Sequence, residues 1–192
     1  MTRLLPDVLV PTVTLSLPEL CAARLDGEVM PIDECFIAID TADSTRARAI
    51  TLRSLVGSRA IADKASALWI YGILPMPPAT HTVCIDRADR SATPRSLRVT
   101  VAQSRFHPGD LCTVGGMTVT TPLRTVYDLA RVRRFSALES RGIRGLIDLF
   151  ALDAASCIAR VDAVRNLPGR RAALRRLHDA AAAAAPQPAL TR

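Results

Sequence analysis

Arginine is the residue type in this sequence whose number and placement most clearly suggest a chemical role. Of the 25 basic residues only Lys64 is a lysine, and the planar guanidinium group of arginine binds phosphates and carboxylates through two parallel hydrogen bonds. Arg171 and Arg175 form a like-charge pair one turn apart near the start of the last predicted helix, where the helix dipole also disfavours cations. Leu174 and Leu177 occupy the apolar stripe of that helix. We therefore expect the arginines to face outward, toward nucleic acid or an acidic protein surface.

Further arginines follow in the same half of the chain. Arg124 lies in the first turn of a predicted helix, whose free N–H groups favour a phosphate, although an Arg124–Asp128 pair at i,i+4 explains it locally. Arginines at the end of that helix are favourable there even without a partner, so both explanations stay open. The candidate nucleic-acid-binding residues are Arg124, Arg131, Arg133, Arg134, Arg141, Arg144, Arg170, Arg171, Arg175 and Arg176.

Charge is distributed unevenly along the chain. Residues 1–45 hold two basic and eight acidic side chains, a net charge of −6, whereas residues 46–192 hold 23 basic and ten acidic ones, a net charge of +13. Such asymmetry is typical of a protein that meets a polyanion through one part of its chain. The sequence therefore predicts contact with duplex DNA through its later part.

The residue patterns of other chemistries are missing. The histidines, at positions 81, 107 and 178, are far apart, and the five cysteines form no CxxC pair. Gly115-Gly116 lies between two predicted strands and not before a helix, so it is no phosphate-binding loop. We expect no catalytic residues, no metal and no cofactor, and hence no enzyme.

Length and composition exclude several classes of protein. The chain has 192 residues, of which 49% are hydrophobic and 4% aromatic, which excludes a disordered chain and argues against a binder of single strands by aromatic stacking. No apolar run approaches the roughly 18 residues of a membrane span, and the first residues include Asp7 and two prolines. We expect a soluble cytoplasmic protein with no membrane partner.

The elements of the first half alternate between helices and strands. Ser16 and Glu19 form a capping box that opens a helix to about Leu25. The other predictions are strands over 28–32 and 36–39, helices over 44–55 and 63–71, an extended connection over 74–79, and a strand over 81–86.

The second half changes from strands to helices. Strands are predicted over 97–103, 110–114 and 117–120, the last two as a hairpin around Gly115-Gly116. Thr121 and Pro122 then begin a helix, Ser136 and Glu139 form a second capping box for a helix to about residue 150, and helices follow over 153–164 and 169–183. The fold class predicted is α+β, with a small N-terminal helix–hairpin, a mixed α/β centre and a helical C-terminal third.

Three consecutive pieces carry a resemblance to a known family. They are the helix Lys64–Gly72, the strand His81–Asp86, and the run Gly115-Gly-Met-Thr-Val-Thr-Thr-Pro-Leu-Arg-Thr-Val-Tyr-Asp-Leu-Ala-Arg131. In this order they resemble the AbiEi-like antitoxins of the abortive-infection E system, a type IV toxin–antitoxin pair, over about residues 55–180. The family-motif positions are Ser66, Gly72, Thr120, Thr121, Pro122, Arg124, Thr125 and Asp128.

The resemblance implies an N-terminal winged helix that binds operator DNA and a C-terminal antitoxin domain. It also implies a partner toxin similar to nucleotidyltransferases, neutralised without a stable complex, and a role in phage defence and transcriptional regulation. Here residues 1–45 are too short for a full winged helix and match only its last helix and wing. We therefore expect a winged-helix-like remnant over 1–45, an antitoxin-like domain over 46–185 and a disordered tail over 186–192.

Two points limit what the resemblance implies. Asp33 and Glu34 lie on the wing of the remnant, so phosphates should repel it, and we expect the DNA contact in the helical third instead. Similar pieces also precede a nuclease domain that resembles the very-short-patch-repair endonucleases, but the alanine-rich residues after about Arg176 leave no room for one. The alternative to a DNA-binding regulator is a protein-interaction module derived from the same family.

Overall fold

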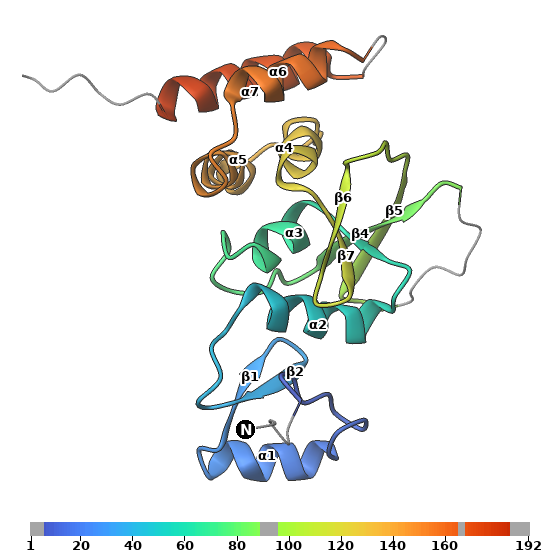
Figure 1. Cartoon of the computed structure of the whole chain (residues 1–192), viewed down its shortest axis with the longest axis vertical. Coiled ribbons are helices and arrows are strands. Elements are labelled where there is room, and N and C mark those ends of the chain that lie inside the picture. Colours follow the sequence, from blue (N-terminus) through green and yellow to red (C-terminus); the bar gives the residue numbers. More distant parts are fainter. Residues whose placement is uncertain (1–5, 89–95, 165–167, 185–192) are drawn as a thin grey trace, which may run out of the picture. The chain divides into compact units, whose positions relative to one another are not determined.

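The structure is a computed structural model that describes residues 6–88, 96–164 and 168–184 (Figure 1). It has the predicted α+β class, with a cluster of helices at its C-terminal end. The chain divides into two compact units, unit 1 (Met1–Val119) and unit 2 (Thr120–Arg192).

Most predicted helices and strands are present within one to three residues of their expected bounds. The helices are α1 (Leu17–Leu25), α2 (Thr45–Val56), α3 (Lys64–Ile70), α4 (Pro122–Ala130), α5 (Ala137–Leu149), α6 (Ala154–Asp162) and α7 (Arg170–Ala184). The strands are β1 (Val29–Ile32), β2 (Cys35–Ala38), β3 (Ile61–Ala62), β4 (His81–Asp86), β5 (Val99–Ser104), β6 (Leu111–Val114) and β7 (Met117–Thr120). The two-residue strand β3 was not predicted.

The start of unit 1 is a helix packed on a hairpin. Ser16 and Glu19 make the predicted capping box at the start of α1, and β1 pairs antiparallel with β2. Leu20 of α1 and Val29 of β1 are buried in a small hydrophobic cluster with Phe36 of β2 and Leu9, whose backbone also bridges Phe36. This helix–hairpin therefore has a small core of its own within unit 1.

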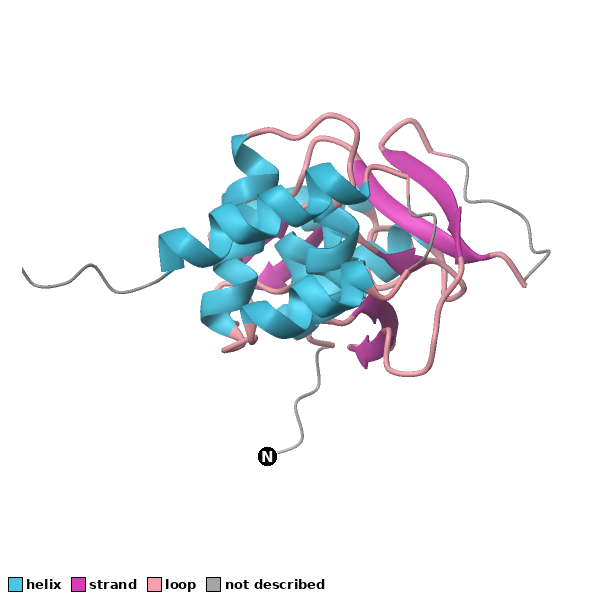
Figure 2. Ribbon diagram, turned by 90° about the horizontal axis from the view of Figure 1, so that it is seen from above, coloured by secondary structure: helices cyan, strands magenta, loops and turns pink. Residues whose placement is uncertain are grey.

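A five-stranded mixed sheet forms the centre of unit 1, in the order β5-β4-β3-β7-β6. The short strand β3 lies in its middle, antiparallel to β4 and parallel to β7. The long strands β4 and β5 are parallel and adjoin each other (Figure 2). The sequence predicted these two strands but not that they pair in parallel.

The β6–β7 turn fits closely against α2. Gly115 and Gly116 both have positive φ values, 54° and 77°, as a tight two-residue hairpin requires. A Cβ atom on Gly115 would lie 2.8 Å from the backbone oxygen of Arg46 in α2. Glycine at position 115 thus serves both the turn and the approach of the hairpin to the helix.

Unit 2 consists of the four helices α4–α7. Pro122 occupies the first turn of α4, and Ser136 and Glu139 form the predicted capping box of α5. Asp153 caps α6 by accepting hydrogen bonds from the backbone of Ala155 and Ser156. Helix α4 packs against α5, α6 and α7, and α7 packs against α5 and α6.

The division into units differs from the predicted domain boundaries. The boundary between Val119 and Thr120 falls inside the predicted domain 46–185, and residues 1–45 belong with the sheet in unit 1. That residues 1–45 are a winged-helix-like remnant stays a prediction. The predicted tail over 186–192 lies outside the described residues.

Candidate nucleic-acid interface

The net charge of the chain belongs entirely to unit 2. Unit 1 has 12 basic and 12 acidic side chains, and unit 2 has 13 basic and six acidic ones, which gives unit 2 the whole net charge of +7. The contrast between the two parts of the chain is therefore smaller when the chain is divided where the structure divides it, 0 against +7 in place of −6 against +13, but the positive net charge lies in unit 2.

Most carboxylates of unit 2 are committed to local structure. Asp162 pairs with Arg170 at 2.6 Å and Asp128 with Arg124 at 2.8 Å. Asp153 and Glu139 accept hydrogen bonds at the starts of α6 and α5. Hydrogen bonds from Ser156 and the α6 backbone lower the pKa of Asp153. Burial raises the pKa of Glu139, but the hydrogen bonds from Ser136 outweigh it and hold that pKa below its ordinary value. These groups do little to neutralise the remaining arginines.

Four of the ten predicted interface arginines have intramolecular partners. Arg124, expected at an exposed helix start, is only 4% exposed, and Arg131 lies over the Tyr127 ring with its guanidinium carbon 4.7 Å from the ring centroid. Arg170 forms the ion pair with Asp162. For these residues the expectation of side chains displayed toward a ligand needs correction, because the fold itself holds them.

Arg176 is the clearest of these corrections. Its Nη1 atom donates hydrogen bonds to the backbone oxygens of Ala130 and Val132, both at 2.8 Å, where α4 ends. Its guanidinium group also lies over the Phe135 ring at 4.3 Å. The last carbonyls of a helix have no partner within the helix, so Arg176 caps α4. From the sequence, Arg176 could be placed only near the start of a helix, because the carbonyl groups that it binds, at Ala130 and Val132, lie far away along the chain.

The side chains of the other six arginines have no hydrogen bond, ion pair or ring contact to any residue that the structure describes. Arg171 and Arg175 lie on α7 opposite its buried residues Ala173 and Leu177, and both are exposed. The remaining four lie on α5 or between α4 and α5, and they are exposed except for Arg144, which is partly exposed: Arg133, Arg134, Arg141 and Arg144. The six form three pairs, one on α7, one on α5 and one between α4 and α5. Because α5 packs against both α4 and α7, these pairs belong to adjoining elements.

The family-motif residues of unit 2 build the junction between β7 and α4. The Thr125 hydroxyl lies 2.8 Å from that of Thr120 and 2.9 Å from the backbone oxygen of Thr121. Thr121 is the N-cap residue as predicted, but its side chain makes no capping hydrogen bond. Together with the Arg124–Asp128 pair, these contacts show a structural role for the motif, since Thr120, Arg124 and Thr125 are buried.

Tyr127 is the centre of an arginine cluster that the sequence analysis missed. The guanidinium carbons of Arg124, Arg131 and Arg160 lie 5.5, 4.7 and 5.6 Å from the centroid of its ring. Arg160 comes from α6, so its approach depends on the packing of α6 against α4. The spacing of Arg124, Tyr127 and Arg131 along one helix could have suggested the first two contacts, but nothing local predicts the third.

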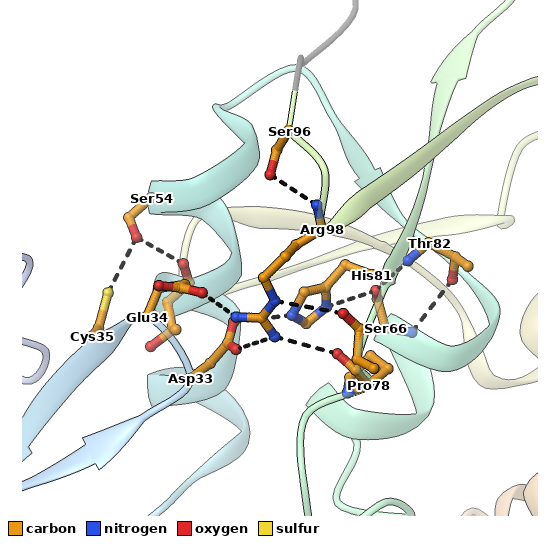
Figure 3. A network of polar contacts seen from close by, with 12 residues as sticks. Asp33, Glu34, Cys35, Ser54, Ser66, Pro78, His81, Thr82, Ser96 and Arg98 are labelled. Atoms are coloured by element: carbon orange, nitrogen blue, oxygen red, sulfur yellow. Dashed lines mark hydrogen bonds and ion pairs between the residues drawn. The ribbon is translucent and has the colours of Figure 1, made fainter.

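In unit 1, the family-motif residue Ser66 belongs to a buried polar network (Figure 3). Its Oγ accepts a hydrogen bond from the backbone N–H of Thr82 and lies 3.0 Å from Nδ1 of His81. The Nε2 atom of His81 lies 3.0 Å from Oδ2 of Asp33, whose other oxygen pairs with Arg98 at 2.8 Å. Gly72, the other motif residue in this unit, ends α3 with a φ of 82°.

The order serine, histidine, aspartate is also that of a hydrolytic triad. A nucleophile must reach its substrate, however, and Ser66 and His81 are both 0% exposed, while the Asp33 side chain is 1% exposed. The network therefore fastens the β1–β2 turn to the sheet of unit 1. Among the described residues there is also no group of three or more potential metal ligands.

Asp33 and Glu34 were expected to repel phosphates from the wing. In the structure, both carboxylates are instead paired with an arginine. Arg98 forms ion pairs with both carboxylates. Burial alone would raise the pKa of Asp33, but the hydrogen bonds and charges of His81 and Arg98 outweigh it and hold that pKa below its ordinary value. The charge of Asp33 is thus satisfied inside unit 1.

Comparisons with known proteins add little to this description. No family model matches the sequence, and no curated protein matches it significantly. Among solved structures, the chain is similar to the RV2827C protein from Mycobacterium tuberculosis, with 13% sequence identity and a TM-score of 0.48. The match covers 85% of this chain and 63% of the other, so this chain spans less than two thirds of that protein's length. A likeness at this level identifies no function.

A membrane-spanning helix was not expected, and across the described ranges no helix combines the length and apolar character needed to cross a membrane.

Proposed function

We propose that this protein is a non-enzymatic, antitoxin-like regulator that binds duplex DNA through exposed arginines of unit 2. One observation carries the proposal. Unit 2 holds the whole net charge of +7, and six of its arginines have no partner among the described residues. Such side chains are free to replace the counterions that surround DNA phosphates.

The proposed interface is defined by three pairs: Arg171 and Arg175 on α7, Arg141 and Arg144 on α5, and Arg133 and Arg134 between α4 and α5. Arg124, Arg170 and Arg176 are left out, because an ion pair or carbonyl oxygens already hold them. The contact would be with phosphates and not with bases, so it positions the protein on DNA without itself selecting a sequence.

The salt dependence of binding tests this proposal. Fluorescence anisotropy with a labelled duplex should give an affinity that falls with salt at a log–log slope near −4.5 if about five phosphates are neutralised. Binding that is independent of salt, or no binding at about 50 mM salt, would reject the proposal.

A double substitution ties the binding to α7. Arg171→Gln with Arg175→Gln should bring the slope to about −2.7, because each phosphate contact contributes about 0.9. The matched control is Arg59→Gln with Arg87→Gln, which removes the same charge from exposed positions of unit 1. Equal weakening by both double variants would show that only the total charge matters.

The antitoxin part of the proposal is supported by the motif resemblance. The functional partner would be a toxin similar to nucleotidyltransferases, neutralised without a stable complex. Co-expression should restore growth of cells that produce the toxin from a neighbouring gene, while purification of this protein should recover no toxin. If the protein leaves growth inhibited, the antitoxin role is rejected and DNA binding stands as a separate question.

The second candidate is a protein-interaction module. Leu149 and Phe150, at the end of α5, are 58% and 39% exposed and lie on the same element as Arg141 and Arg144. Exposed apolar residues bordered by arginines are typical of protein interfaces. Stable co-purification with an acidic protein, abolished in Arg175→Glu, together with a lack of salt-dependent DNA binding, would favour this function.

A further inference from the structure

Helix α1 is apolar on two faces, and only one of them is covered by the residues that the structure describes. Leu20 is buried in the core of the helix–hairpin, and Ala23 packs against that core. Leu17, Cys21 and Leu25 follow one another at intervals of four residues along the outer side of the helix, and all three are exposed, Leu17 to 51% and Leu25 to 88%. A surface helix usually carries polar residues on the side away from the core. We call these three residues the outer stripe of α1.

The surroundings of the outer stripe are apolar as well. Pro18 and Ala22, beside the stripe on α1, are exposed. Val13 and Leu15, in the turn that leads into the helix, are exposed to 80% and 39%. Four of the 11 large hydrophobic side chains that are exposed in the described residues thus lie between positions 13 and 25. Figure 1 shows α1 at the edge of unit 1, with the β1–β2 hairpin on one side. Exposed apolar groups gathered in this way mark an interaction site.

The outer stripe fits a second copy of itself. It contains no charged side chain, so a complementary surface must also be apolar. It has the same residue type, leucine, on both sides of a central cysteine, at equal distances along the helix. Two antiparallel α1 helices related by a two-fold axis at Cys21 therefore place Leu17 of each copy beside Leu25 of the other, as a self-complementary interface requires.

Charge favours the antiparallel direction. The acidic residue in the first turn of α1 is Glu19, and the basic residue in its last turn is Arg24. Antiparallel helices bring the first turn of one copy beside the last turn of the other, so each Glu19 lies closer to Arg24 of the other copy than to Glu19 of that copy. A parallel pair would put like charges side by side. We infer that two copies of this chain form a dimer through the outer stripes of their α1 helices, antiparallel about Cys21.

The dimensions of packed helices place the two Cys21 residues within reach of each other. Helices pack with their axes about 8–10 Å apart and carry their Cα atoms about 2.3 Å from the axis, so facing Cα atoms at the crossing lie roughly 3.5–5.5 Å apart. A disulfide joins Cα atoms that are about 4.4–6.8 Å apart. One short helix and one turn per copy make an interface below the standard size, so the dimer should dissociate in the micromolar range.

Sedimentation velocity of the whole chain under reducing conditions tests the dimer. Over about 5–200 μM the protein should pass from monomer to dimer. Leu25→Ser should raise the dissociation constant by about tenfold or more, because each dimer loses the burial of two leucine side chains. The matched control is Leu97→Ser, which replaces the same residue type at an exposed position of unit 1 outside the stripe and should leave the dissociation constant unchanged.

Cysteine cross-linking tests the direction of the helices. Cys21 is exposed, whereas the other four cysteines, all of which lie in the described residues, are buried or partly buried. Oxidised glutathione should therefore link two wild-type chains, and Cys21→Ser should abolish the link. Two further variants combine Cys21→Ser with either Leu17→Cys or Leu25→Cys. Their mixture should give far more linked dimer than either variant alone, because position 17 of one copy lies beside position 25 of the other.

Four results would overturn the inference. They are a monomer at every concentration, equal effects of Leu25→Ser and Leu97→Ser, no link through Cys21, and linking of the Leu17→Cys or Leu25→Cys variant with itself as readily as with the other. If Leu25→Ser does not fold, Leu17→Ser decides in its place. The outer stripe contains none of the six arginines of the proposed DNA interface, and the salt slope of DNA binding is measured separately, so failure of the dimer leaves the proposed function standing.

Discussion

Arg175 and Arg176 are neighbours in the sequence whose side chains do different things. Arg175 is exposed without a partner among the described residues, whereas Arg176 reaches the carbonyl oxygens at the end of α4. Residue type and charge are identical, so only the three-dimensional surroundings separate a surface contact from a helix cap. A substitution should therefore destabilise the protein at position 176 but hardly at position 175.

Arg176→Gln should lower the free energy of unfolding by roughly 2–3 kcal/mol, because it removes charged hydrogen bonds to the last carbonyl of α4, at Ala130, and to the carbonyl of Val132 just beyond the helix. Arg175→Gln should change it by no more than about 0.5 kcal/mol, as is usual for an exposed position. Urea unfolding followed by circular dichroism measures both values. Equal effects would contradict the capping role of Arg176.

Asp33 provides the second prediction at the residue scale. Removing its charge breaks the buried contacts of this carboxylate with His81 and Arg98, so Asp33→Asn should cost about 3 kcal/mol of unfolding free energy at neutral pH. Asp7→Asn, which breaks the exposed pair between Asp7 and Arg46, is the control and should cost less than about 1 kcal/mol.

The lowered pKa of Asp33 fixes the direction of its pH dependence. Its stabilising contribution is complete above the unfolded-state pKa of about 3.9 and disappears as the pH falls through the lower native value. Stability measured from about pH 5 downward should thus fall more steeply in the wild type than in Asp33→Asn. Parallel curves for the two proteins would show that Asp33 does not carry this dependence.

At the scale of elements, what the sequence could predict was set by how local each signal is. The capping boxes at Ser16 and Ser136 and the proline at position 122 marked three helix starts correctly, because these signals lie within four residues of the feature that they create. The strand Ile61–Ala62 was missed because two residues show no alternation, and it is held in place by strands far along the chain. The Tyr127 cluster was missed for the same reason, since Arg160 comes from another helix.

The β6–β7 turn offers a prediction about an element. Gly115→Ala should destabilise the protein by roughly 1–3 kcal/mol, because the new Cβ atom would meet the backbone oxygen of Arg46, which cannot move without α2. Gly116→Ala should cost less, because its Cβ would meet the end of the Arg53 side chain, which can rotate away. Both positions have positive φ values, so the comparison isolates the contact. Thermal unfolding of the two variants measures the difference, and a larger destabilisation in Gly116→Ala would contradict this explanation.

For the whole molecule, the distribution of charge matters more than its total. Replacing Arg133, Arg134, Arg141 and Arg144 by glutamine should bring the salt slope of DNA binding to about −1.8, because Arg171 and Arg175 remain and each arginine that neutralises a phosphate contributes about 0.9 to the slope. Replacing the exposed unit 1 residues Arg24, Arg53, Arg59 and Arg87 lowers the net charge equally and should leave the slope near that of the wild type. Identical slopes for the two quadruple variants would show that binding follows net charge and is not localised in unit 2.

The central position of β3 has a consequence for synthesis of the chain. Its neighbour β4 follows it closely in sequence, but its other neighbour, β7, pairs Thr118 with Ile61. A nascent polypeptide leaving the ribosome therefore cannot close this sheet until residue 118 has emerged. Until then one edge of β3 lacks its partner strand and is open to pairing with other chains. Correct folding of this sheet therefore depends on the completion of synthesis through β7.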